Sequence, residues 1–220
     1  MNPPPNFNRL ARLYLWKELF SFGLWLAITR QTFLPRLQQS RRALVLGDGD
    51  GRFTASLLRA NPKVHIDAAD ASAAMLAALM RHAAPHANRV TTHLADIRDW
   101  QPPADSLPYD LIATHFFLDC LTTPEVQSLA TRLHAAAAPN ALWVVSDFAI
   151  PAGWFGRLVA LPVVTGLYLS FGLLTGLAVR RLPNHAAALS AAGFTLLQRR
   201  TRLGGLLIAE LWSAPFPESP

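Results

Sequence analysis

The chain has 220 residues and a formal net charge of +6, from 20 lysines and arginines against 14 acidic residues. Its length predicts one domain, and its arginines are scattered or paired without interleaved aromatic residues, which argues against nucleic-acid binding. The single cysteine, Cys120, excludes an intrachain disulfide and is typical of a cytoplasmic protein. The seven histidines lack the spacing of metal ligands, so we expect no bound metal.

The segment 7–37 contains an apolar run, 19–29, that is preceded by basic residues. This run is shorter than a helix that spans a bilayer. Glu18 interrupts the charge pattern of a secretory signal, and no small-residue cleavage site follows the run. We therefore expect one or two amphipathic helices that form an N-terminal cap over residues 1–40, ahead of a main domain over residues 41–220.

The most informative stretch is 43–53, Ala-Leu-Val-Leu-Gly-Asp-Gly-Asp-Gly-Arg-Phe. Its four leading apolar residues predict a buried strand, the alternate Gly47, Gly49 and Gly51 predict a tight turn, and a helical pattern follows. Glycine permits positive φ and lets a ligand lie against the backbone. The next helix begins with free N–H groups and the positive end of its dipole. The stretch therefore predicts a site for a nucleotide-like ligand.

A second predicted strand, 64–70, ends in Asp70, and residues 72–81 follow with a helical pattern. An acidic residue about 20 positions after a glycine-rich turn accepts hydrogen bonds from the hydroxyls of an adenosine ribose. Asp70 is the candidate, whereas Asp67 falls inside the strand. The alternative is that Asp70 only caps the helix, although Ser72 is the better N-cap residue.

The alternate-glycine turn and the run Asp-Ala-Ser-Ala-Ala-Met-Leu at 70–76 resemble the class I S-adenosylmethionine-dependent methyltransferases. The turn looks like the first motif of that family, and the run matches its pattern of an acid, a small residue, serine and Met-Leu. The resemblance covers residues 43–150. It implies that S-adenosylmethionine is bound by Gly47, Gly49, Gly51, Asp70, Ala71 and Met75.

The third predicted strand, 90–94, is followed by Asp96 and Ile97. The resemblance implies that Asp96 accepts a hydrogen bond from the adenine amino group and that Ile97 packs on the adenine ring. For Asp96, the alternative is a solvent-exposed acid in a loop.

The chain departs from the family pattern at Val45, because the family usually has an acid two residues before the first glycine. We expect Asp48 and Asp50 to compensate by facing the amino group of the methionine moiety. The family often carries a helical cap over the cofactor or substrate site, with Tyr14 and Phe22 as candidate lining residues here. Ordinary core packing is the alternative for these two aromatic residues.

The fourth predicted strand, 109–114, is followed by the loop 115–121, which contains two phenylalanines, His115 and Asp119. In open α/β sheets, ligands bind beyond the carboxyl ends of the strands. We therefore expect Thr114 to contact the cofactor and the loop to face the transferable methyl group. His115 is a candidate general base because its ordinary pKa lies near neutrality, and Asp119 is a second candidate. A structural histidine is the alternative, since methyl transfer often needs little beyond alignment.

A fifth predicted strand, 141–148, precedes an apolar insertion over residues 151–188. Residues 158–179 contain no charged residue, and by length they qualify as a transmembrane candidate. A span there would pull the sheet apart, and we expect the run to be broken by Pro162, Gly166, Gly172 and Gly176. We therefore expect helices that line an apolar substrate pocket. Peripheral contact with the inner face of the membrane is left open, because the positive charge favours anionic lipids.

The C-terminal part predicts a helix at 189–192, a strand from 193 to 200 and a last strand from 204 to 212. This order, with Ser-Asp-Phe at 146–148 and the apolar insertion, is loosely similar to methyltransferases of ubiquinone and menaquinone biosynthesis. The family resemblance implies a Rossmann-like, three-layer α/β sandwich. Its mostly parallel, seven-stranded sheet has the order 3-2-1-4-5-7-6, with an antiparallel last hairpin.

We therefore expect an enzyme that transfers a methyl group from S-adenosylmethionine to a small, apolar acceptor. The alternatives are an NAD(P)-dependent Rossmann reductase and a non-catalytic, membrane-associated module that binds a cofactor. The reductase is disfavoured because Arg52 stands where the Gly-x-Gly-x-x-Gly fingerprint needs its third glycine, and because no Tyr-x-x-x-Lys pair occurs. The sequence leaves open the identity of the acceptor and the oligomeric state.

Overall fold

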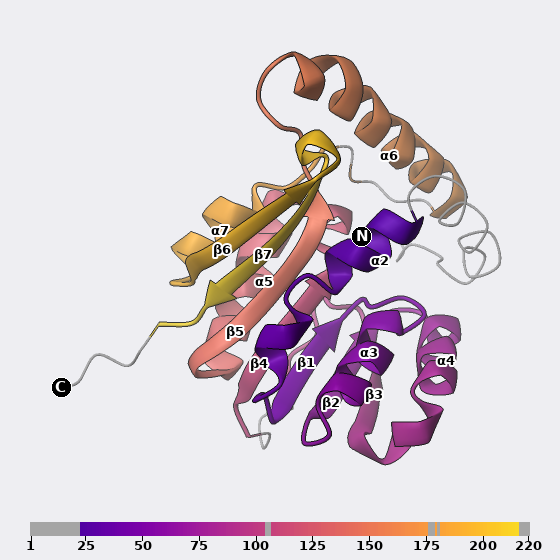
Figure 1. The fold of residues 1–220 in the computed structure, drawn as a ribbon, viewed down its shortest axis with the longest axis vertical. Helices are drawn as coiled ribbons and strands as arrows, with labels where there is room; N and C mark the ends of the chain where they lie inside the picture. Colours follow the sequence, from indigo (N-terminus) through magenta and orange to yellow (C-terminus); the bar gives the residue numbers. More distant parts are fainter. Residues whose placement is uncertain (1–22, 104–106, 176–178, 180, 216–220) are drawn as a thin grey trace.

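One seven-stranded sheet forms the centre of the protein, with helices on both faces (Figure 1). The computed structural model describes residues 23–103, 107–175, 179 and 181–215. The strand order is β3-β2-β1-β4-β5-β7-β6, and β7 runs antiparallel to both of its neighbours while the other pairs are parallel. The Rossmann-like fold and the strand order are thereby confirmed. The strands are β1 Arg42–Leu46, β2 His65–Asp70, β3 Val90–Leu94, β4 Tyr109–His115, β5 Ala137–Phe148, β6 Thr195–Arg202 and β7 Leu207–Ser213.

The central strands are apolar on both sides because helices cover both faces of the sheet. In β1, all four residues from Ala43 to Leu46 are buried, and the strand pairs with β2 and β4. Since these strands are parallel, their carboxyl ends meet at one edge of the sheet. The fifth strand begins at Ala137 instead of 141 and passes through Asn140 at φ 58, where the β4–β5 register shifts.

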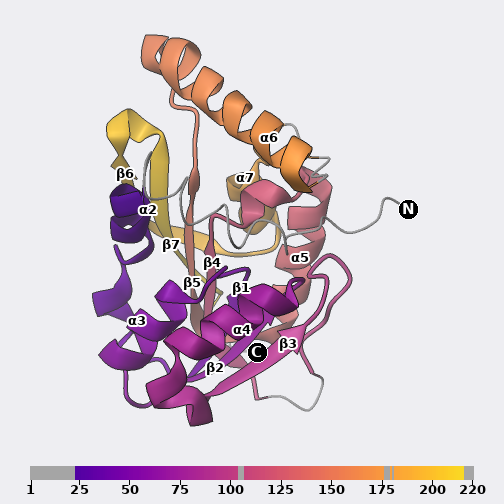
Figure 2. The ribbon, with the colours of Figure 1, turned by 90° about the vertical axis from the view of Figure 1, so that its right-hand side faces the viewer.

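Two pairs of helices form the outer layers (Figure 2). Side chains of α3 (Arg52–Ala60) and α4 (Ala73–His82) belong to the core on one face of the sheet. Those of α5 (Thr123–Ala136) and α7 (His185–Ala191) belong to the core on the other face. Helix α7 begins earlier than the sequence predicts, because the Asn184 side chain caps it by accepting a hydrogen bond from the Ala187 N–H.

The described part of the N-terminal segment packs onto the main sheet. Helix α2 (Gly23–Arg30) contacts β7. The Ser146 hydroxyl at the end of β5 donates a hydrogen bond to the Thr29 carbonyl, 3.3 Å away. This helix therefore reaches the carboxyl edge of the sheet, as a cap over that edge requires. Tyr14 and Phe22 lie outside the described residues.

The apolar insertion contains one continuous helical run. A π-helical turn, Gly156–Ala160, leads directly into α6, Leu161–Thr175. The prediction that the run is broken was therefore wrong for Pro162, Gly166 and Gly172, and Gly176 lies outside the described residues. The reason at Pro162 is the wider π turn before it, in which the Leu161 N–H bonds to the Gly156 carbonyl and the ring can be accommodated.

Helix α6 lies beyond the carboxyl edge of the sheet in both views of the ribbon (Figures 1 and 2). Within the described ranges, no helix combines the length and the apolar character that crossing a membrane requires.

Candidate functional site

The turn between β1 and α3 has all three of its glycines at positive φ, at 63°, 61° and 83° for Gly47, Gly49 and Gly51. Two of them have no room for a side chain. A Cβ at Gly47 would lie 2.1 Å from the Phe117 ring, and one at Gly51 would lie 2.5 Å from the Leu79 Cα of α4. At Gly49, a Cβ would meet no atom of the described residues within 4 Å. Gly49 therefore borders open space, where a ligand can lie against the backbone.

Asp48 lies in the same turn with only 8% of its surface exposed. Its Oδ2 accepts a hydrogen bond from the Thr54 N–H at 2.8 Å, whereas its Oδ1 has no hydrogen-bond partner among the described residues. Burial raises the pKa of Asp48 to about 6, although the Thr54 hydrogen bond and the charge of Arg30 oppose the rise. A buried acceptor without a partner is costly, so this atom fits a ligand that carries a donor, such as an ammonium group.

Asp70 ends β2 at the same edge of the sheet. Its Oδ1 accepts a hydrogen bond from the Ser72 N–H at 2.8 Å, and Ser72 caps α4 by accepting a hydrogen bond from the Met75 N–H. Burial raises the pKa of Asp70 to about 6, and the charge of Asp48 adds to the rise. The structure therefore brings Asp48 and Asp70 together. The turn at Ser72 engages one carboxylate oxygen of Asp70, so a capping role and a ribose-binding role are compatible.

The residues near these two acids differ in burial and in their partners. Ala71 is exposed, whereas Met75 is buried. The carboxylate of Asp50 forms an ion pair with the Arg52 Nε at 2.8 Å. Val45 is 1% exposed and belongs to the sheet core. Of the two acids expected to compensate for Val45, the geometry thus leaves Asp48 with a free oxygen for the amino group.

After β3, the carboxylate of Asp96 is held by Arg98, whose Nε lies 3.0 Å from Oδ1. The hydrogen bonds from Arg98 lower the pKa of Asp96. Ile97 is 4% exposed and belongs to the same core as α5. Their roles as adenine contacts stay predictions, and for Asp96 the adenine amino group would share the carboxylate with Arg98.

The fourth strand ends in two buried polar side chains. The Thr114 hydroxyl accepts a hydrogen bond from Trp143 Nε1 at 3.0 Å. The His115 Nδ1 lies 2.9 Å from the Ser146 hydroxyl oxygen. Burial lowers the pKa of His115 to about 3, and the charge of Arg30 contributes. His115 is therefore a neutral imidazole at pH 7 and a weak base, which favours the structural role. The cofactor contact of Thr114 stays a prediction.

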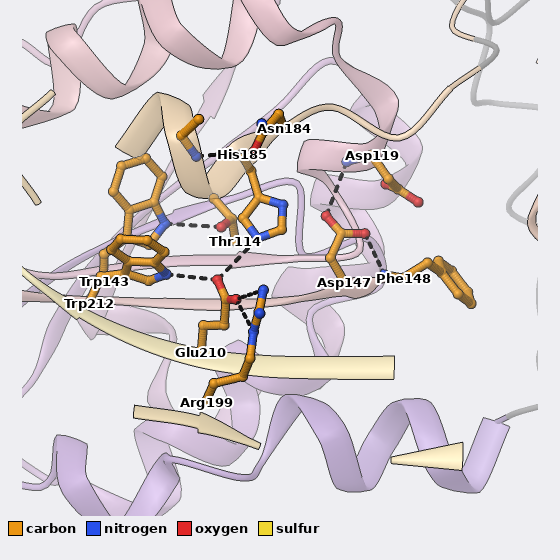
Figure 3. A network of polar contacts seen from close by, with 11 residues as sticks. Thr114, Asp119, Trp143, Asp147, Phe148, Asn184, His185, Arg199, Glu210 and Trp212 are labelled. Carbon is orange, nitrogen blue, oxygen red and sulfur yellow. Dashed lines mark hydrogen bonds and ion pairs between the residues drawn. The ribbon is translucent and has the colours of Figure 1, made fainter. Parts of the chain in front are cut away.

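Two acids meet where β4 and β5 end (Figure 3). The Asp147 carboxylate accepts hydrogen bonds from the Asp119 N–H at 3.1 Å and from the Phe148 N–H at 2.8 Å. Burial raises the pKa of Asp119 to about 6. Burial and the charge of Asp119 raise the pKa of Asp147 well above its ordinary range. The Tyr168 hydroxyl of α6 donates to the Asp119 carbonyl at 2.8 Å, which fixes the helix over the pair.

Asp147 was not among the predicted site residues. Like Asp70, Asp147 is an acid at the carboxyl end of an apolar strand, and this pattern could have identified it.

A second buried network, around Glu210 of β7, lies beside this pair (Figure 3). Glu210 is fully buried and accepts hydrogen bonds from His185 Nε2 at 3.0 Å, Trp212 Nε1 at 2.8 Å and Arg199 Nε at 2.6 Å. Burial opposes ionisation, but the hydrogen bonds and the positive charges outweigh it and lower the pKa of Glu210. Glu210 was not among the predicted site residues, because its partners His185 and Arg199 lie on other elements of the fold.

Arg30, the last residue of α2, brings a buried positive charge to this edge. It is 8% exposed, and its guanidinium carbon lies 5.2 Å from the centre of the Phe116 ring. Its charge acts on both Asp48 and His115. Arg30 was not among the predicted site residues either, although it directly follows the apolar run 19–29.

A surface pocket of about 470 Å³ lies away from these residues. It is lined by Pro108, before β4, and by Arg132 and Ala136 near the end of α5, among others. This is the amino edge of the sheet, opposite the edge where the acids and the glycine-rich turn meet.

Comparison with known proteins agrees with this arrangement. Residues 44–143 match a protein-family model described as a methyltransferase domain. No curated protein matches the chain.

Among solved structures, the chain is similar to the S-adenosylmethionine-dependent methyltransferase SibL in its apo form, with a TM-score of 0.67 and 22% identity over 98% of this chain and 63% of that one. It is also similar to the mitomycin 7-O-methyltransferase MmcR, with a TM-score of 0.66 and 16% identity over 87% of this chain and 54% of that one. The N-methyltransferase NodS from Bradyrhizobium japonicum gives a TM-score of 0.58 and 14% identity over 86% of this chain and 97% of that one.

The chain thus spans less than two thirds of SibL and MmcR and nearly all of NodS. At these low identities the solved structures show only that the fold is similar. The family-model match is a similarity of sequence. Residues 44–143, less than half of the chain, thus match a methyltransferase-domain model, and the fold is similar to that of the S-adenosylmethionine-dependent methyltransferase SibL.

Proposed function

We propose that this protein transfers a methyl group from S-adenosylmethionine to a small, apolar acceptor. The observation that carries the proposal is the β1–α3 turn, where the open space at Gly49 adjoins a buried carboxylate oxygen of Asp48 that has no partner among the described residues. The match of residues 44–143 to a methyltransferase-domain model supports the choice of cofactor. When bound, S-adenosylmethionine supplies an electrophilic methyl group on a sulfonium.

Asp48 of the turn and Asp70 at the end of β2 fit two different parts of that cofactor. The free oxygen of Asp48 would accept a hydrogen bond from the ammonium group of the methionine moiety, and ionised partners make such bonds strong. Asp70 would accept from the ribose hydroxyls, as the acid after a second strand does in nucleotide sites. The match to a methyltransferase-domain model and the absence of a third fingerprint glycine at Arg52 disfavour a nicotinamide cofactor.

An apolar acceptor is supported by the side chains around the ends of β4 and β5. The rings of Phe116 and Phe148 lie 5.3 Å apart, and α6 is docked over the neighbouring Asp119 by Tyr168. Apolar walls with few polar groups are typical of small-molecule sites. The likeness to quinone-pathway methyltransferases stays a prediction within this proposal.

Asp119 is a better candidate than His115 for receiving a proton from the acceptor. Methylation of a hydroxyl or an amine releases one proton, and an efficient base has a pKa near the working pH. The pKa of Asp119 is about 6, whereas that of His115 is about 3. We therefore assign proton acceptance to the Asp119 carboxylate and a positioning role to His115, which holds the end of β4 against Ser146.

A thermal-shift experiment with three ligands tests the choice of cofactor. S-adenosylmethionine and S-adenosylhomocysteine at about one hundred times the dissociation constant should each stabilise the protein by about 2.7 kcal/mol. NAD(H) should produce no shift in the melting temperature. A clear shift with NAD(H) and none with the sulfur compounds would favour the reductase and reject the proposal.

The pH dependence of binding tests the role of Asp48. An ammonium group stabilises the charged carboxylate, so its contribution is full above the pKa of about 6 and is lost as the pH falls below that value. Between about pH 7.5 and about pH 5, calorimetry should show an affinity loss for S-adenosylhomocysteine that exceeds the loss for 5′-methylthioadenosine by about tenfold. The second ligand lacks the amino-acid group, so it serves as the control for Asp70, whose pKa is also about 6.

The variant Asp48→Asn should remove the difference between the two ligands. If the wild-type protein shows the same pH dependence with both ligands, Asp48 does not face the ammonium group.

A further inference from the structure

The helical run over residues 154–169 has one face packed against the protein. Its buried positions, Gly156, Ala160, Val164 and Tyr168, recur every four residues, which places them in one row along the helix. This row packs on a small core that includes Leu206 in the turn before β7. This side of the helical run is therefore buried by contacts within the chain.

The opposite side of the same run is apolar and exposed. The exposed fraction is 72% for Trp154, 72% for Leu158, 46% for Leu161 and 64% for Leu169. A surface helix ordinarily carries polar residues on the side away from the core. Single exposed leucines are common in proteins, but a group on one helix face marks an interaction surface. We refer to these four residues as the exposed apolar face.

The sequence around this face is uniformly basic. Between Asp147 and Glu210 the chain has no acidic residue, and it has six arginines. Four of them, Arg157, Arg181, Arg199 and Arg200, are exposed in the described structure, and Arg199 forms an ion pair with Glu210. Arg157 lies within the helical run itself, beside Leu158. The surface thus combines apolar side chains with positive charge, which is the composition of helices that lie in the interface of an anionic bilayer.

We propose that the exposed apolar face docks the protein onto a membrane surface that contains anionic lipids, in addition to its proposed methyl transfer. The run lies in the plane of the interface, with Trp154 at the depth of the headgroups, where tryptophan is favoured. Arg157, within the run, meets the lipid phosphates. A second copy of the chain fits this face less well, because a symmetric contact would bring two basic surfaces together.

Vesicle sedimentation with the full chain tests this docking. The protein should sediment with vesicles of phosphatidylcholine and phosphatidylglycerol, and at least tenfold less with phosphatidylcholine alone. High salt should weaken the binding because it screens the arginines. The double variant Leu158→Glu and Leu161→Glu should lower binding to the anionic vesicles at least tenfold. The matched control is Leu107→Glu, which changes a leucine that is 72% exposed before β4, at the amino edge of the sheet.

Two further measurements distinguish a loss of membrane docking from a loss of folding or of cofactor binding. The double variant should retain the wild-type circular dichroism and the thermal shift with S-adenosylhomocysteine, so its loss of vesicle binding cannot result from unfolding. Docking is rejected if the wild-type protein fails to sediment with anionic vesicles, or if Leu107→Glu weakens binding as much as the double variant. It is also rejected if light scattering shows a dimer that the double variant dissociates while vesicle binding is absent.

Discussion

Replacing Asp70 by alanine is expected to weaken the binding of S-adenosylhomocysteine at least tenfold while the fold is retained. A carboxylate that accepts hydrogen bonds from two ribose hydroxyls contributes about 1.5–3 kcal/mol to binding, because the acceptor is charged. The folded state should lose little. The variant removes one hydrogen bond from the Ser72 N–H, but it also removes a buried acid whose pKa of about 6 shows that its charge is disfavoured.

Calorimetry at about pH 7.5, where Asp70 is ionised, measures this effect. The control is Asp99→Ala, which removes an exposed acid in the loop after β3 and should leave the affinity unchanged. Circular dichroism and a melting curve check the fold of both variants. An unchanged affinity in Asp70→Ala would show that Asp70 is only the cap of the α4 turn, the alternative that the sequence leaves open.

Replacing Glu210 by alanine should lower the free energy of unfolding by about 3–5 kcal/mol, as expected when one member of a buried charged network is removed. The variant leaves the His185 and Trp212 nitrogens without their acceptor and Arg199 without its counter-ion. Urea denaturation, with its midpoint and slope, measures the change. The control is Arg200→Ala, which alters an exposed neighbour on β6 and should change stability by less than about 0.5 kcal/mol.

Glu210→Gln separates the loss of charge from the loss of shape if the alanine variant does not fold. The amide keeps one acceptor oxygen, so its destabilisation should be smaller than that of alanine. The wild-type protein should also lose stability in acid. The pKa of Glu210 is lowered in the folded state, so its contribution is full above the unfolded value of 4.5 and declines below it. A loss below about 1 kcal/mol in Glu210→Ala would show that the network contributes little net stability.

Local chain geometry explains why the glycine-rich turn and the acid that ends β2 could be predicted from the sequence. The alternate glycines at 47, 49 and 51 all have positive φ, and each lies within a few residues of the strand and the helix that it joins. Asp70 and Ser72 interact within one turn, so capping could be predicted as well. The strand order was predicted from the family resemblance, and the observed sheet has that order.

The sequence determined the strand, turn and helix pattern and the acids that end the strands, because these depend on residues close together in the chain. Only the tertiary structure decided what surrounds each polar side chain. It buries His115, and it places the Asp119 N–H within hydrogen-bond distance of the Asp147 carboxylate. It also surrounds Glu210 with hydrogen-bond donors from His185, Arg199 and Trp212. These outcomes depend on strand register and on desolvation, and desolvation moves a pKa only after distant segments have packed around the group.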